Sequence, residues 1–173
     1  WGLEEMRRDL LGLLEDHRPR SLILCGDIVD RGLAEIRRDA EVLLDAARER
    51  CHEVILIRGN HDRRGIDREA MVDVHVDGST GFVFHHGHEM ERRLEEYPGS
   101  THVVGHLHPA LRLRDGAGLR LKFPALSKQT LGEEVLWVLP AFSPWAAGGG
   151  DALGQLWGCW PETGGRPGRI LAG

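Results

Sequence analysis

Aspartate, asparagine and histidine side chains gather in four short, glycine-containing clusters. The clusters are Gly26-Asp27-Ile28-Val29-Asp30-Arg31-Gly32, Gly59-Asn60-His61-Asp62, His85-His86-Gly87-His88 and Gly105-His106-Leu107-His108. Carboxylate, amide oxygen and neutral imidazole are the ligands that hard or borderline divalent cations prefer. Glycine in each cluster lets the backbone bend tightly around an ion. Together the clusters predict a metal centre.

The spacing within one cluster favours a pair of metal ions. His106 and His108 are separated by one residue, so on an extended segment both side chains point the same way. They would then reach two ions roughly 3.5–4 Å apart, which Asp27 would bridge. Two ions joined in this way lower the pKa of a shared water, supply hydroxide at neutral pH and hold a phosphoryl group for in-line attack. The pattern therefore favours hydrolysis of a phosphate ester.

Each of these clusters follows an apolar segment that reads as a strand. The first part of the chain predicts a helix, a strand, a second helix and a second strand, over 3–14, 21–25, 33–47 and 54–57. This alternation favours parallel strands, whose carboxyl ends carry the polar residues. Because such ends converge on one edge, residues far apart in sequence can share a site.

After about residue 70 the pattern changes to alternating segments joined by turns. It predicts strands over 72–76, 82–84, 102–104, 110–113, 119–123 and 135–139, with turns at 77–81 and 115–118. A parallel half followed by an antiparallel half predicts two sheets packed face to face with helices outside. The expected fold class is therefore α/β, a four-layer αββα sandwich of two mixed β-sheets.

Length and composition limit the class of protein. The 173 residues predict one domain with one core over 1–145, followed by a glycine-rich, weakly ordered tail over 146–173. The net charge of −5 is too acidic for a chain that grips long nucleic acid mainly by charge. The sequence has no apolar run of roughly 18–20 residues and no leader pattern, which argues against a membrane partner and an intact secretory signal. Three cysteines without CxxC spacing fit a cytoplasmic location.

The clusters resemble the motifs of the calcineurin-like metallophosphoesterase superfamily, which run D-x-H, G-D-x-x-D, G-N-H-[DE], H and G-H-x-H. Four of the five occur in this order between Gly26 and His108. Residues 86–88, 104–113 and 139–142 look like the bacterial DNA ligase-associated phosphoesterases. Residues 26–32 look instead like the G-D-x-V-D-R-G of serine/threonine phosphatases. The resemblance implies a metallophosphoesterase-like fold.

The resemblance also implies which residues hold metal. The implied ligands are Asp27 as the bridge between two ions, Asn60, His86 and His106 at one ion, and His108 at the other. Mn²⁺ is the ion that the family implies, and the ligand set would also accept Fe or Zn.

Three further residues take catalytic roles by the same resemblance. His61 would protonate the leaving alkoxide or steady the transition state, Asp30 would orient its imidazole, and Arg31 would hold phosphate oxygens. An imidazole beside a carboxylate keeps its proton more readily, as a general acid requires.

The D-x-H motif does not precede Asp27 in this sequence. His17 cannot replace it, because Glu15-Asp16-His17 ends a predicted helix and not a strand. Either a segment before Trp1 supplies the motif, or the protein holds one ion well and the other poorly. We favour the first explanation, because Trp1 is not a natural start and every later motif is intact.

The sequence thus predicts a metal-dependent phosphoesterase. Its substrate would be a phosphodiester if the ligase-associated resemblance holds, and that family implies nucleic acid or DNA-repair enzymes as partners. One alternative is a serine/threonine-type protein phosphatase, which Asp30 and Arg31 support. The other is a non-catalytic scaffold with this fold, which the missing D-x-H supports and the presence of His61 opposes.

Several other conspicuous residues have plainer explanations. Strand alternation places His85 on the face opposite His86, so we expect a structural role for it, and His88 is a lesser candidate for substrate contact. Cys25 is expected to be a small buried hydrophobe, and His102 a surface or core-edge residue. Basic residues flank the turn at 115–118, and a solvated edge hairpin is favoured there over a finger that binds nucleic acid.

Overall fold

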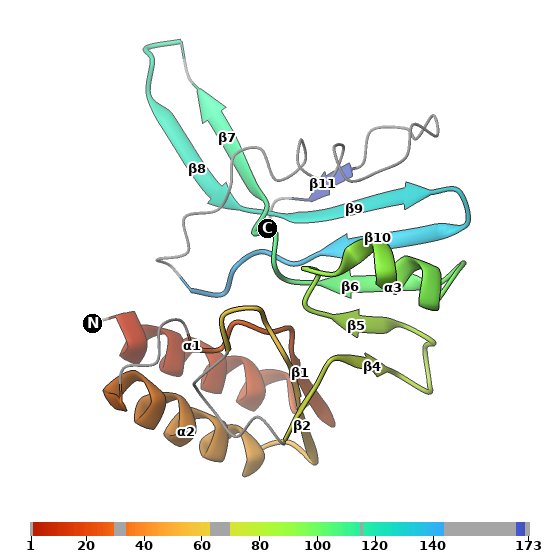
Figure 1. The fold of residues 1–173 in the computed structure, drawn as a ribbon. Coiled ribbons are helices and arrows are strands. Elements are labelled where there is room, and N and C mark those ends of the chain that lie inside the picture. Colours follow the sequence, from red (N-terminus) through yellow and green to blue (C-terminus); the bar gives the residue numbers. More distant parts are fainter. Residues whose placement is uncertain (1, 30–33, 63–69, 115, 144–168, 172–173) are drawn as a thin grey trace. The chain divides into compact units, whose positions relative to one another are not determined.

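The computed structural model describes residues 2–29, 34–62, 70–114, 116–143 and 169–171 (Figure 1). The chain divides into two compact units, residues 1–75 and 76–173, which we call unit 1 and unit 2. The predicted boundary between a domain over 1–145 and a tail stays a prediction. Of the predicted tail, the described part is Arg169–Leu171, and the other residues from 146 onward lie outside the described ranges.

Unit 1 alternates helices with parallel strands. Its elements are α1 (Gly2–His17), β1 (Ser21–Leu24), α2 (Ala34–Arg48), β2 (Glu53–Ile57) and β3 (Met71–Val72). The strands form one sheet in the order β1-β2-β3, and both pairs are parallel. The predicted helices and the first two strands are confirmed to within a few residues. Because β1 and β2 are parallel neighbours, the loops that follow them leave the same edge of the sheet.

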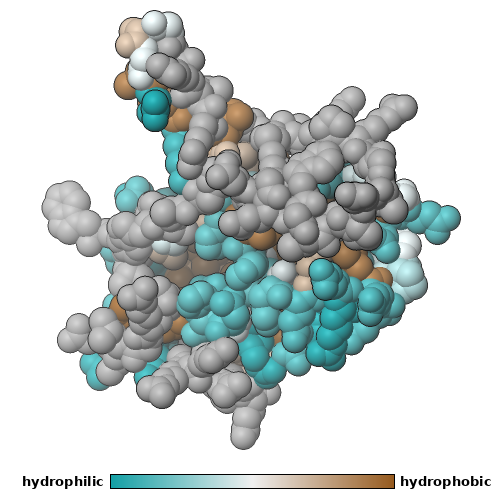
Figure 2. Space-filling model, turned by 45° about the horizontal axis from the view of Figure 1, so that its top comes forward, coloured by the Kyte–Doolittle hydropathy of each residue, from teal (hydrophilic) through white to brown (hydrophobic). Residues whose placement is uncertain are grey.

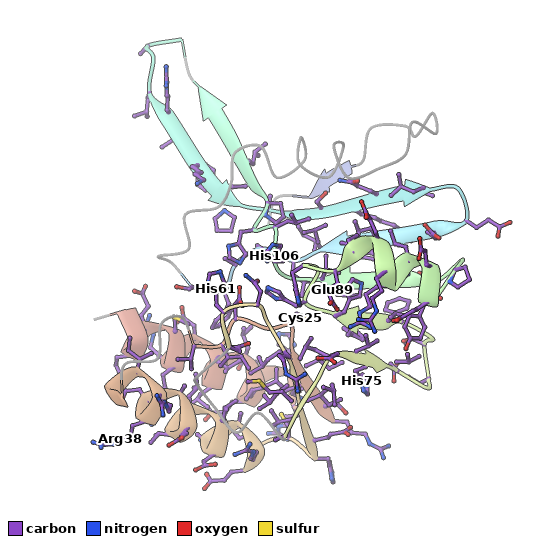
Figure 3. All side chains as sticks on the ribbon, viewed as in Figure 1. Cys25, Arg38, His61, His75, Glu89 and His106 are labelled. Atoms are coloured by element: carbon purple, nitrogen blue, oxygen red, sulfur yellow. The ribbon has the colours of Figure 1, made fainter. Side chains whose placement is uncertain are left out.

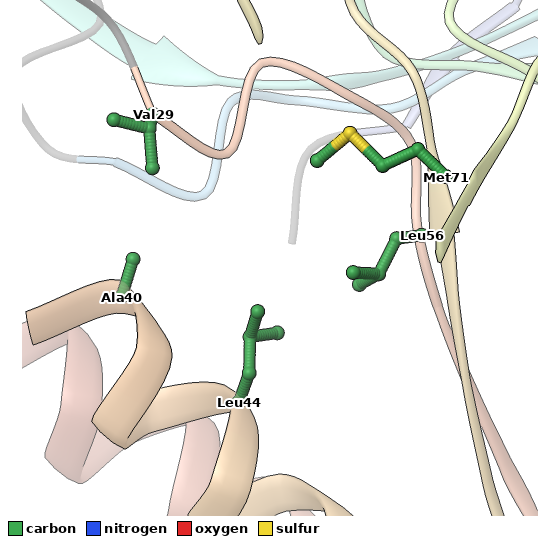
Figure 4. Packing of buried hydrophobic residues seen from close by; sticks show 5 residues of the cluster. All are labelled: Val29, Ala40, Leu44, Leu56 and Met71. Carbon is green, nitrogen blue, oxygen red and sulfur yellow. The ribbon is translucent and has the colours of Figure 1, made fainter. Parts of the chain in front are cut away.

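Apolar residues at helical spacing explain why α1 and α2 form. In α2, Ala40 and Leu44 pack against Val29, Leu56 and Met71 from the loops and strands of the same unit (Figure 4). A second cluster joins α1 to the end of α2, and its buried members are Leu10, Leu14, Ala47 and Cys51. The apolar stripe of each helix therefore faces the core. Among the described residues, no helix is long and apolar enough to cross a membrane.

Unit 2 contains most of the strands. The remaining elements are β4 (Val74–Val76), β5 (Val83–His85), α3 (Met90–Glu96), β6 (Thr101–Val104), β7 (Ala110–Arg114), β8 (Arg120–Pro124), β9 (Leu126–Leu131), β10 (Glu134–Val138) and β11 (Arg169–Leu171). One six-stranded sheet has the order β11-β9-β10-β6-β5-β4, and β7 and β8 form a separate antiparallel pair. Helices and strands alternate or mix in both units, so the α/β class is confirmed.

The second half of the chain is not purely antiparallel, and that part of the prediction is wrong. β5 pairs with β6 and β6 pairs with β10 in parallel, whereas the β10–β9 and β9–β11 pairs are antiparallel. A parallel pair needs a crossover connection, and α3 supplies it between β5 and β6. α3 has no clear apolar stripe in the sequence, because this short helix is mostly charged. Its buried Arg93 is held by ion pairs to Glu89 and Glu96.

The strand predicted over 72–76 is divided between two sheets. β3 ends at Val72 and pairs with β2, while β4 starts at Val74 and belongs to the six-stranded sheet. Asp73 stands between them, and its carboxylate pairs with the Arg58 guanidinium. The alternation of apolar residues runs through this break, so the pattern alone cannot reveal it.

The β8 strand of the β7–β8 hairpin is exposed, but its surface is not only polar. Alternate residues of and beside β8 expose apolar side chains, namely Leu119, Leu121 and Phe123. In Figure 2, brown hydrophobic patches lie next to teal hydrophilic ones on the hairpin. The side chains of Arg112 and Arg114, which belong to the predicted basic flank, lie outside the described residues.

Two histidines, rather than apolar residues, fill part of the interior of unit 2. His85 and His102 are about fully buried, at 1% and 0% exposure, so the surface or core-edge position expected for His102 is wrong. The 3.2 Å contact from His102 Nε2 to the Tyr97 carbonyl requires a proton on Nε2, so Nδ1 of the neutral ring accepts a hydrogen bond from His85 Nε2 at 3.2 Å. His85 Nδ1 is buried without a partner among the described residues. A structural role for His85 agrees with this arrangement.

We expect acid to destabilise the protein through His85. Burial first, and then the charges of His102 and Arg93, lower the pKa of His85 to about 3 from its ordinary 6.5. The unfolded chain therefore binds this proton more readily, so stability is full above about pH 6.5 and falls as the pH drops towards about 3. Between about pH 7.5 and about pH 5 the loss from this group is about 2 kcal/mol.

Urea unfolding at several pH values tests this expectation. His85→Gln should flatten the acid limb, whereas His52→Gln, at an exposed position, should keep the wild-type pH dependence. An equally steep acid limb in His85→Gln would contradict the assignment.

We also expect the core of unit 1 to depend on Leu44, which is 1% exposed. Leu44→Ala should lower the free energy of unfolding by about 2–5 kcal/mol, because it leaves a cavity between α2 and the sheet. Val42→Ala is the matched control on the same helix, since Val42 is 53% exposed, and should change stability by less than about 0.5 kcal/mol. Equal losses in the two variants, measured by urea unfolding, would show that the core is packed differently.

Candidate metal centre

In unit 1, the loops after β1 and β2 bring together Asp27, Asn60, His61 and Asp62, which we call the Asp27 group. Figure 3 labels Cys25 at the end of β1 and His61 in the loop after β2. Asp27 has a positive φ of 54°, a left-handed conformation in which aspartate and asparagine are the best tolerated residues after glycine. The backbone N–H of His61 donates to Asp27 Oδ1 at 2.9 Å. The two loops thus meet at the Asp27 carboxylate.

Asp62 joins the two loops through its buried carboxylate. It is 1% exposed, and its carboxylate accepts bonds from the backbone N–H groups of Asp27 at 2.8 Å, Gly59 at 2.8 Å and Val29 at 3.1 Å. Sequence reasoning assigned Asp62 no role. The signal that was present is the acidic last position of the G-N-H-[DE] motif.

Gly59 is needed for the same close approach. A Cβ at this position would overlap both the backbone nitrogen and the carboxylate of Asp27. The obstacle includes backbone, which cannot rotate away as a side-chain end can. Only glycine therefore lets the loop after β2 lie against Asp27.

The side chains of the Asp27 group differ in how far solvent can reach them. Asp27 and Asn60 are half-buried, and His61 is exposed. The group offers a carboxylate and an amide oxygen, which suit a hard divalent cation, and an imidazole that solvent can reach. Asp30 and Arg31, the other predicted catalytic residues, lie outside the described residues.

In unit 2, three imidazoles form a second set, His86, His88 and His106, which we call the histidine group. They come from the loops after β5 and β6, and Figure 3 labels His106 where the chain leaves β6. The His86 carbonyl accepts bonds from the N–H groups of Gly105 at 3.1 Å and His106 at 3.0 Å. Because β5 and β6 are parallel neighbours, their loops are joined at the same edge of the sheet.

Two ring nitrogens of the histidine group lie close together. His106 Nδ1 lies 3.0 Å from His86 Nε2, and His86 is 2% exposed. At this distance the two rings share a hydrogen bond, in which one ring donates and the other accepts. The two neutral nitrogens converge from neighbouring loops, and imidazole nitrogen is a ligand type that suits a borderline divalent cation. The His88 ring centroid is 5.3 Å from that of His86, and the side chain is exposed.

Gly87 makes room within the histidine group. It has a φ of +109°, and a Cβ there would lie 3.2 Å from Val104 Cβ and 3.4 Å from His106 Cβ. A side chain at this position would therefore push the two loops apart.

His106 and His108 were expected to point the same way on an extended segment. That expectation is wrong, because the segment is not extended. Residues 106 and 107 form a turn, in which the His108 N–H donates to the Gly105 carbonyl at 3.3 Å and His108 has a φ of 44°. Strand pairing ends at Val104, and the chain turns at Gly105 before β7 begins. The assignment of His108 as a ligand stays a prediction.

Cys25 is half-buried and not fully buried, so the expected small buried hydrophobe is only partly matched. Burial raises the pKa of its thiol to about 12, so the group is not a thiolate at neutral pH. A thiol in this state is a poor nucleophile and a poor metal ligand.

A known protein family matches the part of the chain that contains most of these residues. The model of the calcineurin-like phosphoesterase family matches residues 2–98, more than half of the 173. The match includes the Asp27 group, His86 and His88, whereas His106 and His108 follow it in the sequence. No curated protein is similar enough to count as a match.

One solved structure is similar over much of its length. It is a single mutant of Vps29 from Entamoeba histolytica, with 15% sequence identity, a TM-score of 0.48 and coverage of 82% of this chain and 70% of that chain. The family model alone carries the assignment, and with its support this chain belongs to the calcineurin-like phosphoesterase family.

Proposed function

We propose that this chain is a metal-dependent phosphoesterase that hydrolyses a phosphodiester. One observation supports a metal centre most directly: in a chain of this family, His86 Nε2 and His106 Nδ1 converge to 3.0 Å, so both ring nitrogens could face one cation. The imidazoles come from two neighbouring strand ends, and Gly87 leaves room for their approach.

The metal ligands of the proposal follow the order of the family motifs. By that order Asp27 would be shared by two divalent cations, Asn60, His86 and His106 would complete the site of one, and His108 would serve the other. Mn²⁺ is the cation we propose first, and Fe or Zn would suit the same donors. Bound divalent cations supply charge neutralisation on the phosphoryl oxygens and acidify water at neutral pH.

His61 is the proposed general acid. The His61 backbone N–H donates a hydrogen bond to the Asp27 carboxylate, which fixes the position of the backbone. The imidazole is exposed, so it is accessible to a bound ester. The imidazolium gives its proton to the leaving alkoxide. Asp30 would orient this ring and Arg31 would hold the non-bridging phosphate oxygens, as the family motif implies.

The phosphodiester is supported by the local sequences around the histidine group. Residues 86–88 and 104–113 resemble the DNA ligase-associated branch of the superfamily. Nucleic acid is then the proposed substrate source, and DNA-repair enzymes are the proposed partners.

We expect His61 and Asp27 to separate turnover from metal binding. His61→Gln should lower kcat about 10²–10⁴-fold with Mn²⁺ content unchanged, because the backbone bond to Asp27 remains while the acid is lost. Asp27→Asn should lose Mn²⁺, because an amide is a weaker ligand than a carboxylate, and asparagine still tolerates the positive φ. Metal analysis after dialysis and steady-state hydrolysis of bis(p-nitrophenyl) phosphate measure both effects.

Thermal unfolding of the metal-free variants is the control for folding. Equal loss of Mn²⁺ from His61→Gln and Asp27→Asn would show that the two roles are wrongly divided.

The substrate class has its own test. With Mn²⁺, kcat/KM for bis(p-nitrophenyl) phosphate should exceed that for p-nitrophenyl phosphate by at least about tenfold, a difference of about 1.4 kcal/mol in transition-state binding. A preference for the monoester would support a protein phosphatase instead. Hydrolysis of neither ester by Mn²⁺-loaded protein would support a non-catalytic scaffold.

A further inference from the structure

The bridging role proposed for Asp27 requires its carboxylate to keep one direction. Asp27 nevertheless lies in a loop, in a left-handed conformation that is less favourable than extended or helical backbone. Something outside the residue itself must therefore hold its backbone in place.

The Asp62 carboxylate holds this backbone at two points. Its Oδ2 accepts from the N–H of Asp27 and its Oδ1 from the N–H of Val29, so the bonds lie on both sides of Ile28. Oδ2 also accepts from the N–H of Gly59, at the start of the second loop. One side chain therefore sets the separation of the loops after β1 and β2.

The bonds of Asp62 do not fit a simple helix cap. A capping side chain accepts from N–H groups two or three residues after it, whereas these three donors all precede Asp62. Two of them are more than 30 residues away, in the loop that carries Asp27. The side chain is 1% exposed, so water cannot take over these bonds if the carboxylate is lost.

We propose that Asp62 is a positioning residue, which fixes the Asp27 backbone so that its carboxylate is presented to metal. The metal part of this inference rests on the proposed function. The positional part concerns hydrogen bonds within unit 1 and can be measured without metal.

The informative variant is Asp62→Asn, which preserves the shape of the side chain. Its single amide oxygen can replace one carboxylate oxygen, but its NH₂ then faces a backbone N–H, donor against donor. In metal-free protein, hydrogen exchange at the Asp27 and Val29 amides, followed by NMR, should become at least tenfold faster. Mn²⁺ binding measured by calorimetry should weaken about 10–100-fold, as is typical when a residue that supports a metal ligand is changed.

Two control variants separate position from stability and from charge. Leu14→Ala destabilises the other apolar cluster of the same unit, which contains no residue of either loop, so below its unfolding temperature it should bind Mn²⁺ as the wild type does. Gly59→Ala keeps the Asp62 charge but pushes against the Asp27 backbone, so it should weaken Mn²⁺ binding as Asp62→Asn does.

The exchange rates and the Mn²⁺ affinities of these variants together test the positioning role of Asp62. Faster exchange with weaker Mn²⁺ binding in Asp62→Asn supports the inference if Gly59→Ala shows the same weaker binding and Leu14→Ala does not. Unchanged exchange, wild-type Mn²⁺ affinity in Asp62→Asn, or wild-type affinity in Gly59→Ala overturns it. If the wild type binds no Mn²⁺, the proposed function fails, and the exchange rates alone then decide whether Asp62 positions Asp27.

Discussion

The buried carboxylate of Asp62 is the constraint on which the geometry of unit 1 depends. A buried charge is tolerated only when hydrogen bonds replace the water it has lost, and three backbone N–H groups do so here. These donors belong to two loops that meet because β1 and β2 are parallel neighbours. The sheet brings the loops to one edge, the carboxylate sets their spacing, and Gly59 permits the contact.

In unit 2, a backbone carbonyl and a glycine hold the corresponding two loops together. The loops after β5 and β6 also leave parallel neighbours, and the His86 carbonyl ties them together through the N–H groups of Gly105 and His106. With Gly87 providing room, the two ring nitrogens approach to 3.0 Å. In both units, glycine lies beside the chemistry-bearing residues in the loops, and the strands determine which loops are neighbours.

The sequence predicted most of the elements that carry these loops, because their apolar patterns are strong. The helices over 3–14 and 33–47 have clear stripes, and α1 and α2 are where those stripes predict them. The apolar pattern failed at two places. α3 is short and mostly charged, and only Met90 and Leu94 give it an apolar face. The break between β3 and β4 occurs inside a continuous alternation. The turn after β6 likewise follows from the end of strand pairing at Val104.

Residue types and spacing by themselves determined the kind of chemistry, since carboxylate, amide and imidazole in four glycine-containing clusters belong to a divalent metal centre. They also separated His85 from His86, because neighbouring strand residues face opposite ways. Only the tertiary structure decided that His85 meets His102 in the interior and that Asp62 holds Asp27. The physical reason is that these partners are 17 and 35 residues apart, and strand pairing, which no local pattern encodes, brings them within a hydrogen bond of each other.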